Sequence, residues 1–224
     1  MKKKDKDLKK EHKKVFKVLR FVEKYFFRWI FPYRLHGNLT KYNEGSLIFI
    51  GNHYNYLDVA FPLRITDRPI NFIAKQELWD NGGVMKWFAT KCQCIPAKRD
   101  GSDVATVKAS LKILREGGVI NIFPEGTRNK VDGGELLPFH GGAAALSIKT
   151  QTPIVPIVKI ESIKLFKKVD VIVGDPIEFR QYYGKKVSRE ELEMCDEMMR
   201  DALNNMRLAF IEKNNIKIKT KKSK

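Results

Sequence analysis

Apolar runs of strand length alternate with segments of helical periodicity along most of the chain. The strand-like runs cover 47–50, 69–74, 93–97, 119–123, 154–160 and 169–173, and the helical segments cover 13–31, 57–65, 76–90, 103–116, 141–150 and 188–213. Strands that alternate with helices predict an α/β fold, with a central mixed, mostly parallel sheet flanked by helices.

The first helical segment is amphipathic. Its apolar face carries Val15, Val18, Leu19, Val22, Phe26, Trp29 and Ile30, and another face carries Lys13, Lys17, Arg20, Lys24 and Arg28. A basic face beside an aromatic-rich apolar face is typical of a helix lying in a membrane interface. A helix packed on the domain with a solvated basic face is the alternative.

The domain organisation follows from these patterns. We expect a basic tail and membrane-associating helix over 1–34, an α/β domain over 35–213 and a basic tail over 214–224. Within the first region, the lysine-rich residues 1–12 are expected to be unstructured.

The net charge of +17 is concentrated at the two ends of the chain. Such basic tails favour an anionic partner, either nucleic acid or an acidic membrane leaflet. The alternative is that they only keep the protein soluble. No signal peptide and no uncharged apolar stretch of about 18 residues is visible, so a conventional membrane span is not expected. Three cysteines are too few for a disulfide framework and are expected as reduced thiols in a cytosolic compartment.

One stretch, SLIFIGNHYNYLD over 46–58, carries candidate chemistry. Its apolar strand stops at Gly51, and Asp58 falls in the opening turn of the next helical segment. Residues five apart in a continuous helix point away from each other, so His53 and Asp58 meet only if His53 lies in the turn before the helix. That geometry suits a general base and its orienting carboxylate. Helix capping alone would also place such residues here.

Two further loops follow strands in the same way. One holds Lys98 and Arg99, and the other holds Glu125 and Arg128. Ligands of open α/β sheets bind outside the carboxyl ends of the strands, so the three loops are expected to converge on one site. Their basic residues suit a phosphate group, although Lys98-Arg99 alone would also fit a solvated loop.

The segment NHYNYLD, followed about seventy residues later by FPEGTR over 123–128, resembles the 1-acylglycerol-3-phosphate acyltransferase family of glycerolipid synthesis. The resemblance covers roughly 37–176. In it, the Lys98-Arg99 loop takes the place of the family's phosphate-binding second motif, and Val155-Pro156-Ile157 matches its apolar fourth motif.

The resemblance implies that His53 is the general base, that Asp58 holds it, and that an acyl group passes from a thioester to the hydroxyl of a lysophospholipid, giving phosphatidic acid. It implies acceptor binding by Glu125, Gly126, Thr127, Arg128, Lys98 and Arg99, and an acyl pocket with Val155, Pro156 and Ile157. Neither a bound cofactor nor a metal is expected. The partners would be acyl-CoA or acyl-acyl carrier protein, the lysophospholipid and an anionic membrane surface, without nucleic acid. The expected location is the cytoplasmic face of the cell membrane, peripheral or monotopic.

Three positions depart from the family pattern. Asn55 stands where the family usually has serine, Lys98-Arg99 where it often has an acidic residue and arginine, and His140 where lysine commonly follows phenylalanine. The first two leave open the same chemistry on glycerol-3-phosphate or another lysophospholipid. Two alternatives come from other classes: a basic nucleic-acid-binding protein, favoured by the charge and the interleaved aromatic residues, and a metal-dependent hydrolase using His53, Asp58, Glu125 and His140.

Overall fold

A twisted sheet forms the centre of the computed structural model, which describes residues 3–80, 82–97, 104–140, 142–217 and 221–222. In these residues the main sheet has seven strands, in the spatial order β1 (Tyr33–Gly37), β8 (Val169–Val173), β7 (Ile154–Lys159), β2 (Leu47–Gly51), β5 (Val119–Ile122), β3 (Asn71–Lys75) and β4 (Ile95–Ala97). The β7–β8 pair is antiparallel, and the other neighbours are parallel. The predicted mixed, mostly parallel sheet is confirmed.

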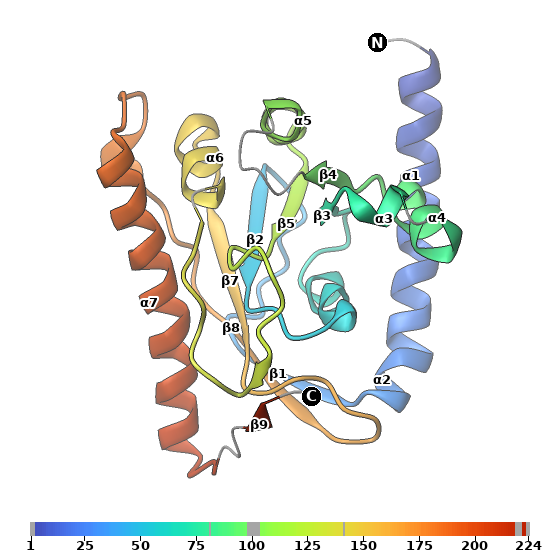
Figure 1. Cartoon of the computed structure of the whole chain (residues 1–224). Helices are drawn as coiled ribbons and strands as arrows, with labels where there is room; N and C mark the ends of the chain where they lie inside the picture. The colour runs from blue at the N-terminus through green and yellow to red at the C-terminus, as the bar shows by residue number, and fades with distance from the viewer. Residues whose placement is uncertain (1–2, 81, 98–103, 141, 218–220, 223–224) are drawn as a thin grey trace.

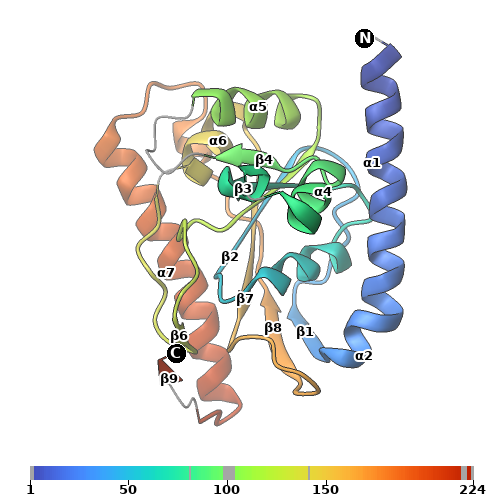
Figure 2. The ribbon, with the colours of Figure 1, turned by 45° about the vertical axis from the view of Figure 1, so that its right-hand side comes forward.

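Helices cover both faces of this sheet (Figures 1 and 2). The α-helices are α1 (Lys3–Val22), α2 (Arg28–Ile30), α3 (Glu77–Asp80), α4 (Gly83–Lys91), α5 (Val104–Arg115), α6 (Gly142–Thr150) and α7 (Arg189–Lys213). A π-helix, η1 (Glu23–Phe27), and two 3₁₀ helices, η2 (Tyr56–Arg64) and η3 (Arg180–Tyr182), complete the set in the described residues. Two short strands, β6 (Val131–Asp132) and β9 (Lys221–Lys222), pair outside the main sheet.

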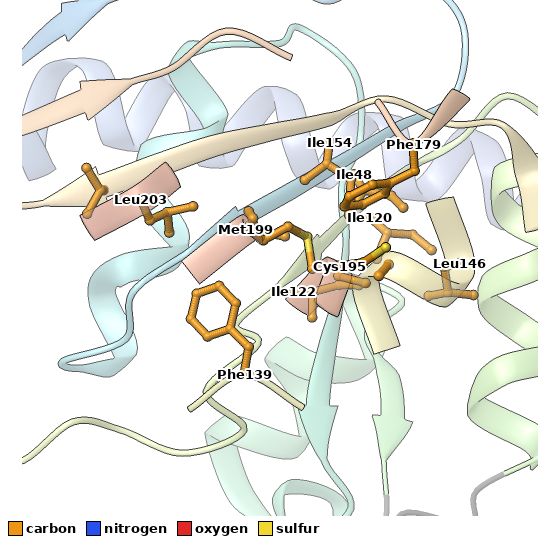
Figure 3. Close-up of a cluster of buried hydrophobic side chains, with 14 of the residues drawn as sticks. Ile48, Ile120, Ile122, Phe139, Leu146, Ile154, Phe179, Cys195, Met199 and Leu203 are labelled. Carbon is orange, nitrogen blue, oxygen red and sulfur yellow. The ribbon is translucent and has the colours of Figure 1, made fainter. Parts of the chain in front are cut away.

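The alternation of side chains along each strand divides the core in two. On one face of β2, Ile48 belongs to a cluster with Leu146 of α6 and Met199 of α7 (Figure 3). On the other face, Phe49 belongs to a cluster with Phe16 of α1, and Phe61 of η2 lies in the same cluster. The sheet is therefore the middle of three layers, and η2 lies between the sheet and α1 (Figure 2).

The N-terminal part differs from expectation. Residues 3–12, predicted to be unstructured, form the first half of α1, because this helix packs on the domain through His12 and Phe16, both buried. The strand β1 was not predicted, since its short polar sequence YRLHG is held by parallel pairing with the distant β8. The predicted helix over 57–65 is the 3₁₀ helix η2. The three cysteines are free thiols; Cys92 and Cys195 are buried, and Cys94 is half-buried.

Candidate active site

The turn between β2 and η2 shapes the candidate site. A Cβ at Gly51 would lie 2.6 Å from the carbonyl oxygen of Ile157, so only glycine allows β7 to approach here. After the turn, Asn55 caps η2, because its side-chain oxygen accepts a hydrogen bond from the Leu57 amide at 2.8 Å. The residue that replaces the family's serine is thus a good helix cap, and it fixes the first turn that contains Asp58.

Asp58 folds back over this turn and contacts His53. Its Oδ2 lies 2.9 Å from His53 Nδ1 and accepts hydrogen bonds from the amides of Tyr54 at 2.7 Å and Asn55 at 2.9 Å. His53 therefore lies in the turn before the helix, and the predicted geometry of the pair is confirmed. When Nδ1 carries the ring proton and donates a hydrogen bond to Asp58, the other ring nitrogen, Nε2, is left as a proton acceptor.

The electrostatic surroundings keep His53 neutral. Burial lowers the pKa of the His53 imidazole below 6.5; Asp58 opposes this shift, and the charges of Lys159 and Arg128 add to it. Burial alone would raise the pKa of Asp58, but the Lys159 ammonium and the hydrogen bonds from His53 and Asn55 bring it below its ordinary value. A neutral imidazole beside an ionised carboxylate is the state that a general base requires.

The loop after β5 holds His53 from the other side. Phe123 stacks on the imidazole, with ring centroids 4.1 Å apart and planes 11° from parallel. Glu125 is buried, and its two oxygens accept hydrogen bonds from the amides of His53 at 2.9 Å and Leu137 at 3.1 Å. The Asn129 amide donates to the His53 carbonyl at 2.6 Å. The two loops therefore converge, as predicted.

The other predicted site residues take different positions. Gly126, Thr127 and Arg128 are exposed; Gly126 has a φ of +63°, which favours glycine, and the Arg128 guanidinium lies 4.4 Å from the centre of the Tyr56 ring. Lys98 and Arg99 lie outside the described residues. The three acyl-pocket candidates, Val155, Pro156 and Ile157, are buried in β7 beside β2, and their role in binding an acyl chain stays a prediction.

The metal-hydrolase alternative would need several ligands around one point. Across the described ranges, no group of three or more His, Cys, Asp or Glu side chains is placed to hold an ion. Glu125 already uses both oxygens on backbone amides. His140 is exposed and belongs to the loop that passes Gly126, where a Cβ would lie 3.8 Å from the His140 ring.

Two residues of the site were missed in the sequence. The side chain of Asn52 forms a pair of 2.9 Å hydrogen bonds with the backbone of Lys159, one with its carbonyl and one with its amide. The Lys159 ammonium donates to the Asn52 carbonyl and lies 3.6 Å from Asp58 Oδ2. A lysine at the end of an apolar strand has the same pattern as a surface lysine, so only its tertiary position shows this role.

Comparison with known proteins agrees with this geometry. A family model described as Acyltransferase matches residues 33–159. The 1-acyl-sn-glycerol-3-phosphate acyltransferase of Bacillus subtilis (strain 168) is 27% identical over 187 residues, covering 77% of this chain and 89% of the relative. A chloroplastic enzyme of the same name from Brassica napus is 29% identical over 178 residues, or 74% of this chain, and the match spans 48% of its length. The crystal structure of the 1-acyl-sn-glycerophosphate (LPA) acyltransferase PlsC from Thermotoga maritima has the same fold, with a TM-score of 0.65, 23% identity and coverage of 92% and 84% of the two chains.

Proposed function

The chain belongs to the acyltransferase family, and from this we propose that it moves a fatty acyl group from an acyl thioester to the free hydroxyl of 1-acylglycerol-3-phosphate, producing phosphatidic acid. The observation that carries the proposal is the contact between His53 and Asp58 at the carboxyl end of β2, beside the exposed loop with Arg128. The relatives named for this reaction support the choice of acceptor.

The geometry supports direct transfer in one active site. Nε2 of His53 takes the proton from the acceptor hydroxyl as its oxygen attacks the thioester carbon, while Asp58 stabilises the imidazolium that forms. When the carbon–sulfur bond breaks, the leaving thiolate receives that proton from His53. The neighbours of His53 in the sequence are Asn52 and Tyr54, so neither serine nor cysteine is adjacent for an acyl-enzyme.

Acceptor recognition is proposed to rest on Arg128. Its guanidinium is exposed and steadied by the Tyr56 ring, so it is free to bind a phosphate bidentately. Gly126 and Thr127, which belong to the same loop, would bind the acceptor together with Arg128, and Lys98 and Arg99 would assist in binding its phosphate. Glu125 is better assigned to positioning than to phosphate contact, because a buried carboxylate would repel the phosphate and already binds two amides.

A membrane surface is the proposed location. Exposed apolar side chains gather on the N-terminal helices and the β7–β8 loop, and we call them the N-terminal aromatic patch: Val18, Phe21, Val22, Tyr25, Phe26, Trp29, Leu165 and Phe166. The two parts are joined, since the Phe166 amide donates to the Ile30 carbonyl at 2.8 Å and its ring lies 6.0 Å from that of Trp29. Aromatic side chains are favoured where one end of a residue is apolar and the other is wet.

The patch and the catalytic pair lie toward the same end of the sheet. β7 ends at Lys159 beside the site, and the chain continues from there into the loop that carries Phe166 (Figure 1). A cavity of about 340 Å³ next to the patch is lined by Arg20, Phe21, Glu23, Lys24, Tyr25, Lys41, Leu63, Arg64 and Asp67, among which cations outnumber carboxylates. This arrangement supports docking on anionic lipid, which we propose takes place at the cytoplasmic face, in a peripheral or monotopic manner.

No helix in the described part of the chain is long and apolar enough to cross a bilayer.

The test of the proposed reaction is a panel of acceptors and donors. Purified protein is given 1-acylglycerol-3-phosphate, glycerol-3-phosphate, lysophosphatidylcholine or monoacylglycerol, each with acyl-CoA and with acyl-acyl carrier protein, and the products are measured by mass spectrometry. We expect the highest kcat/KM with 1-acylglycerol-3-phosphate. A higher value with glycerol-3-phosphate or lysophosphatidylcholine would assign that acceptor instead. Absence of any transfer would contradict the proposal.

A further inference from the structure

Lys159 is a charged side chain in an unusual place. It is the last residue of β7, only 1% of its surface is exposed, and its ammonium faces the site rather than solvent. Nζ donates to the Asn52 carbonyl and lies 3.6 Å from Asp58 Oδ2. Lysine is almost never fully buried unless it is paired, so this position calls for a partner and a reason.

Aromatic rings surround the ammonium as well. Nζ lies 5.8 Å from the ring centre of Tyr54 and 5.7 Å from those of Phe61 and Phe123. Ring faces stabilise a cation that has lost its water. Tyr54 and Phe61 flank the turn with Asp58, and Phe123 is the ring that stacks on His53. Lys159 therefore lies behind the catalytic pair, where it cannot reach a substrate.

We propose that Lys159 is a positioning residue of the acyl-transfer site, whose buried ammonium keeps Asp58 ionised and directed at His53. The inference rests on the proposed function, because it assigns the role of the base to His53. Lys159 acts through Asp58 and Asn52. It ties the carbonyl before His53 to the end of β7 and places a positive charge behind the carboxylate.

The effect of that charge on protonation can be worked out. The groups that face His53 are Asp58 of η2, Lys159 of β7, and Glu125 and Arg128 of the loop after β5. With Lys159 present, the charge of Asp58 is balanced. Without it, the His53–Asp58 pair carries an uncompensated negative charge in a buried site, and it takes up a proton more readily.

Both protonated forms of the pair are inactive. An imidazolium has no lone pair for the acceptor hydroxyl, and a neutral Asp58 no longer stabilises the imidazolium that forms during transfer. Loss of the Lys159 charge is therefore expected to move the acid limb of kcat/KM to higher pH, whichever residue holds the proton. A residue needed only for packing would lower activity without moving this limb.

The test compares Lys159→Met with Lys149→Met, which removes an exposed lysine of α6. We expect Lys159→Met to lower kcat/KM at neutral pH at least about 10-fold and to move the acid limb up by about one pH unit, a modest effect for a neighbouring charge. Lys149→Met should match the unaltered chain. An acid limb that stays in place in folded Lys159→Met protein would overturn the proposal.

Two further measurements keep the test decisive. The Asp58→Asn/Lys159→Met double variant removes both members of the ion pair and leaves neither of them as an unpaired charge, so it should fold at least as well as Lys159→Met and show no loss of activity beyond that of Asp58→Asn. If both variants are insoluble, Lys159 serves core packing and the proposal fails. The titration of His53, followed by NMR without substrate, should shift upward in folded Lys159→Met; this readout separates failure of the present inference from failure of the proposed reaction.

Discussion

The half-buried imidazole of His53 determines the pH dependence expected of the proposed reaction. Burial lowers its pKa below 6.5, and the neutral form is the proposed base, so activity should persist as the pH falls until His53 binds a proton. We therefore expect the acid limb of kcat/KM to lie below pH 6.5. A pH series with a saturating donor would measure it. An acid limb above pH 6.5 would show that Asp58 outweighs burial at this site.

Arg128 is the residue proposed to bind the acceptor in the same reaction. A charge-assisted hydrogen bond contributes about 1.5–3 kcal/mol, so Arg128→Ala should raise the KM for 1-acylglycerol-3-phosphate roughly 10-fold or more and change the KM of the donor much less. The matched control is Lys130→Ala, which removes an exposed neighbouring cation. If Arg128→Ala changed the KM of donor and acceptor equally, Arg128 would have no role in binding the phosphate. The same conclusion would follow if monoacylglycerol, which has no phosphate, reacted as well as 1-acylglycerol-3-phosphate.

At the scale of the element, the sequence predicted the turn between β2 and η2 better than it predicted the residues that hold this turn in place. Gly51 marks the end of β2 and the spacing of His53 and Asp58 defines the turn, so local signals were enough. The roles of Lys159 and of the buried Glu125 depend on contacts between strands and loops that are distant in sequence. Patterns of polarity do not contain those contacts.

The docked helix α1 buries a histidine, His12. Burial lowers the pKa of His12 to about 4, while contacts with the backbone of Cys92 and Ile70 oppose the shift. The folded state thus binds fewer protons than the unfolded chain. The stability gained from neutral His12, up to about 3 kcal/mol, is present above pH 6.5 and is lost as the pH falls toward 4.

Chemical unfolding from pH 7 to 4 measures this loss, and the His12→Gln variant isolates it. Burial raises the pKa of Glu23 of η1, and Tyr33 and nearby cations oppose the shift. The contribution of Glu23 to stability therefore falls with rising pH, and it is the same in both proteins. We expect a smaller fall in stability for His12→Gln than for the unaltered chain. If the free energy of unfolding fell with pH in parallel for the two proteins, His12 would have no part in the acid sensitivity of the docked helix.

For the whole molecule, the N-terminal aromatic patch should govern attachment to lipid. Trp29 and Phe166 are 73% and 64% exposed. Full burial of such a side chain in the membrane interface contributes about 1.5–3 kcal/mol. The Trp29→Ser/Phe166→Ser variant should therefore weaken vesicle binding at least about 10-fold. Flotation with phosphatidylglycerol vesicles measures it. Met194→Ser/Met198→Ser, on exposed positions of α7, is the control. Equal flotation of the two double variants would contradict the role of the N-terminal aromatic patch in lipid attachment.

The overall architecture was predictable where the chain repeats strand and helix, and less so at its start. Seen as a sequence, α1 has an apolar face and a basic face, and its pattern does not say which apolar side chains meet lipid and which meet protein. The structure divides them: Phe16 of α1 is fully buried against the sheet, whereas Phe21 of α1, Phe26 of η1 and Trp29 of α2 are exposed. That division depends on the tertiary position of the helix, which periodicity does not encode.

The central claim is that His53 acts as the base in transfer of an acyl group to 1-acylglycerol-3-phosphate. The most direct measurement is the rate of phosphatidic acid formation by the unaltered chain and by His53→Ala, with circular dichroism to confirm that both are folded. A general base contributes about 10²–10⁴-fold, so the variant should lose at least about 99% of the rate. A folded His53→Ala protein that keeps more than about half of the rate would contradict the assignment.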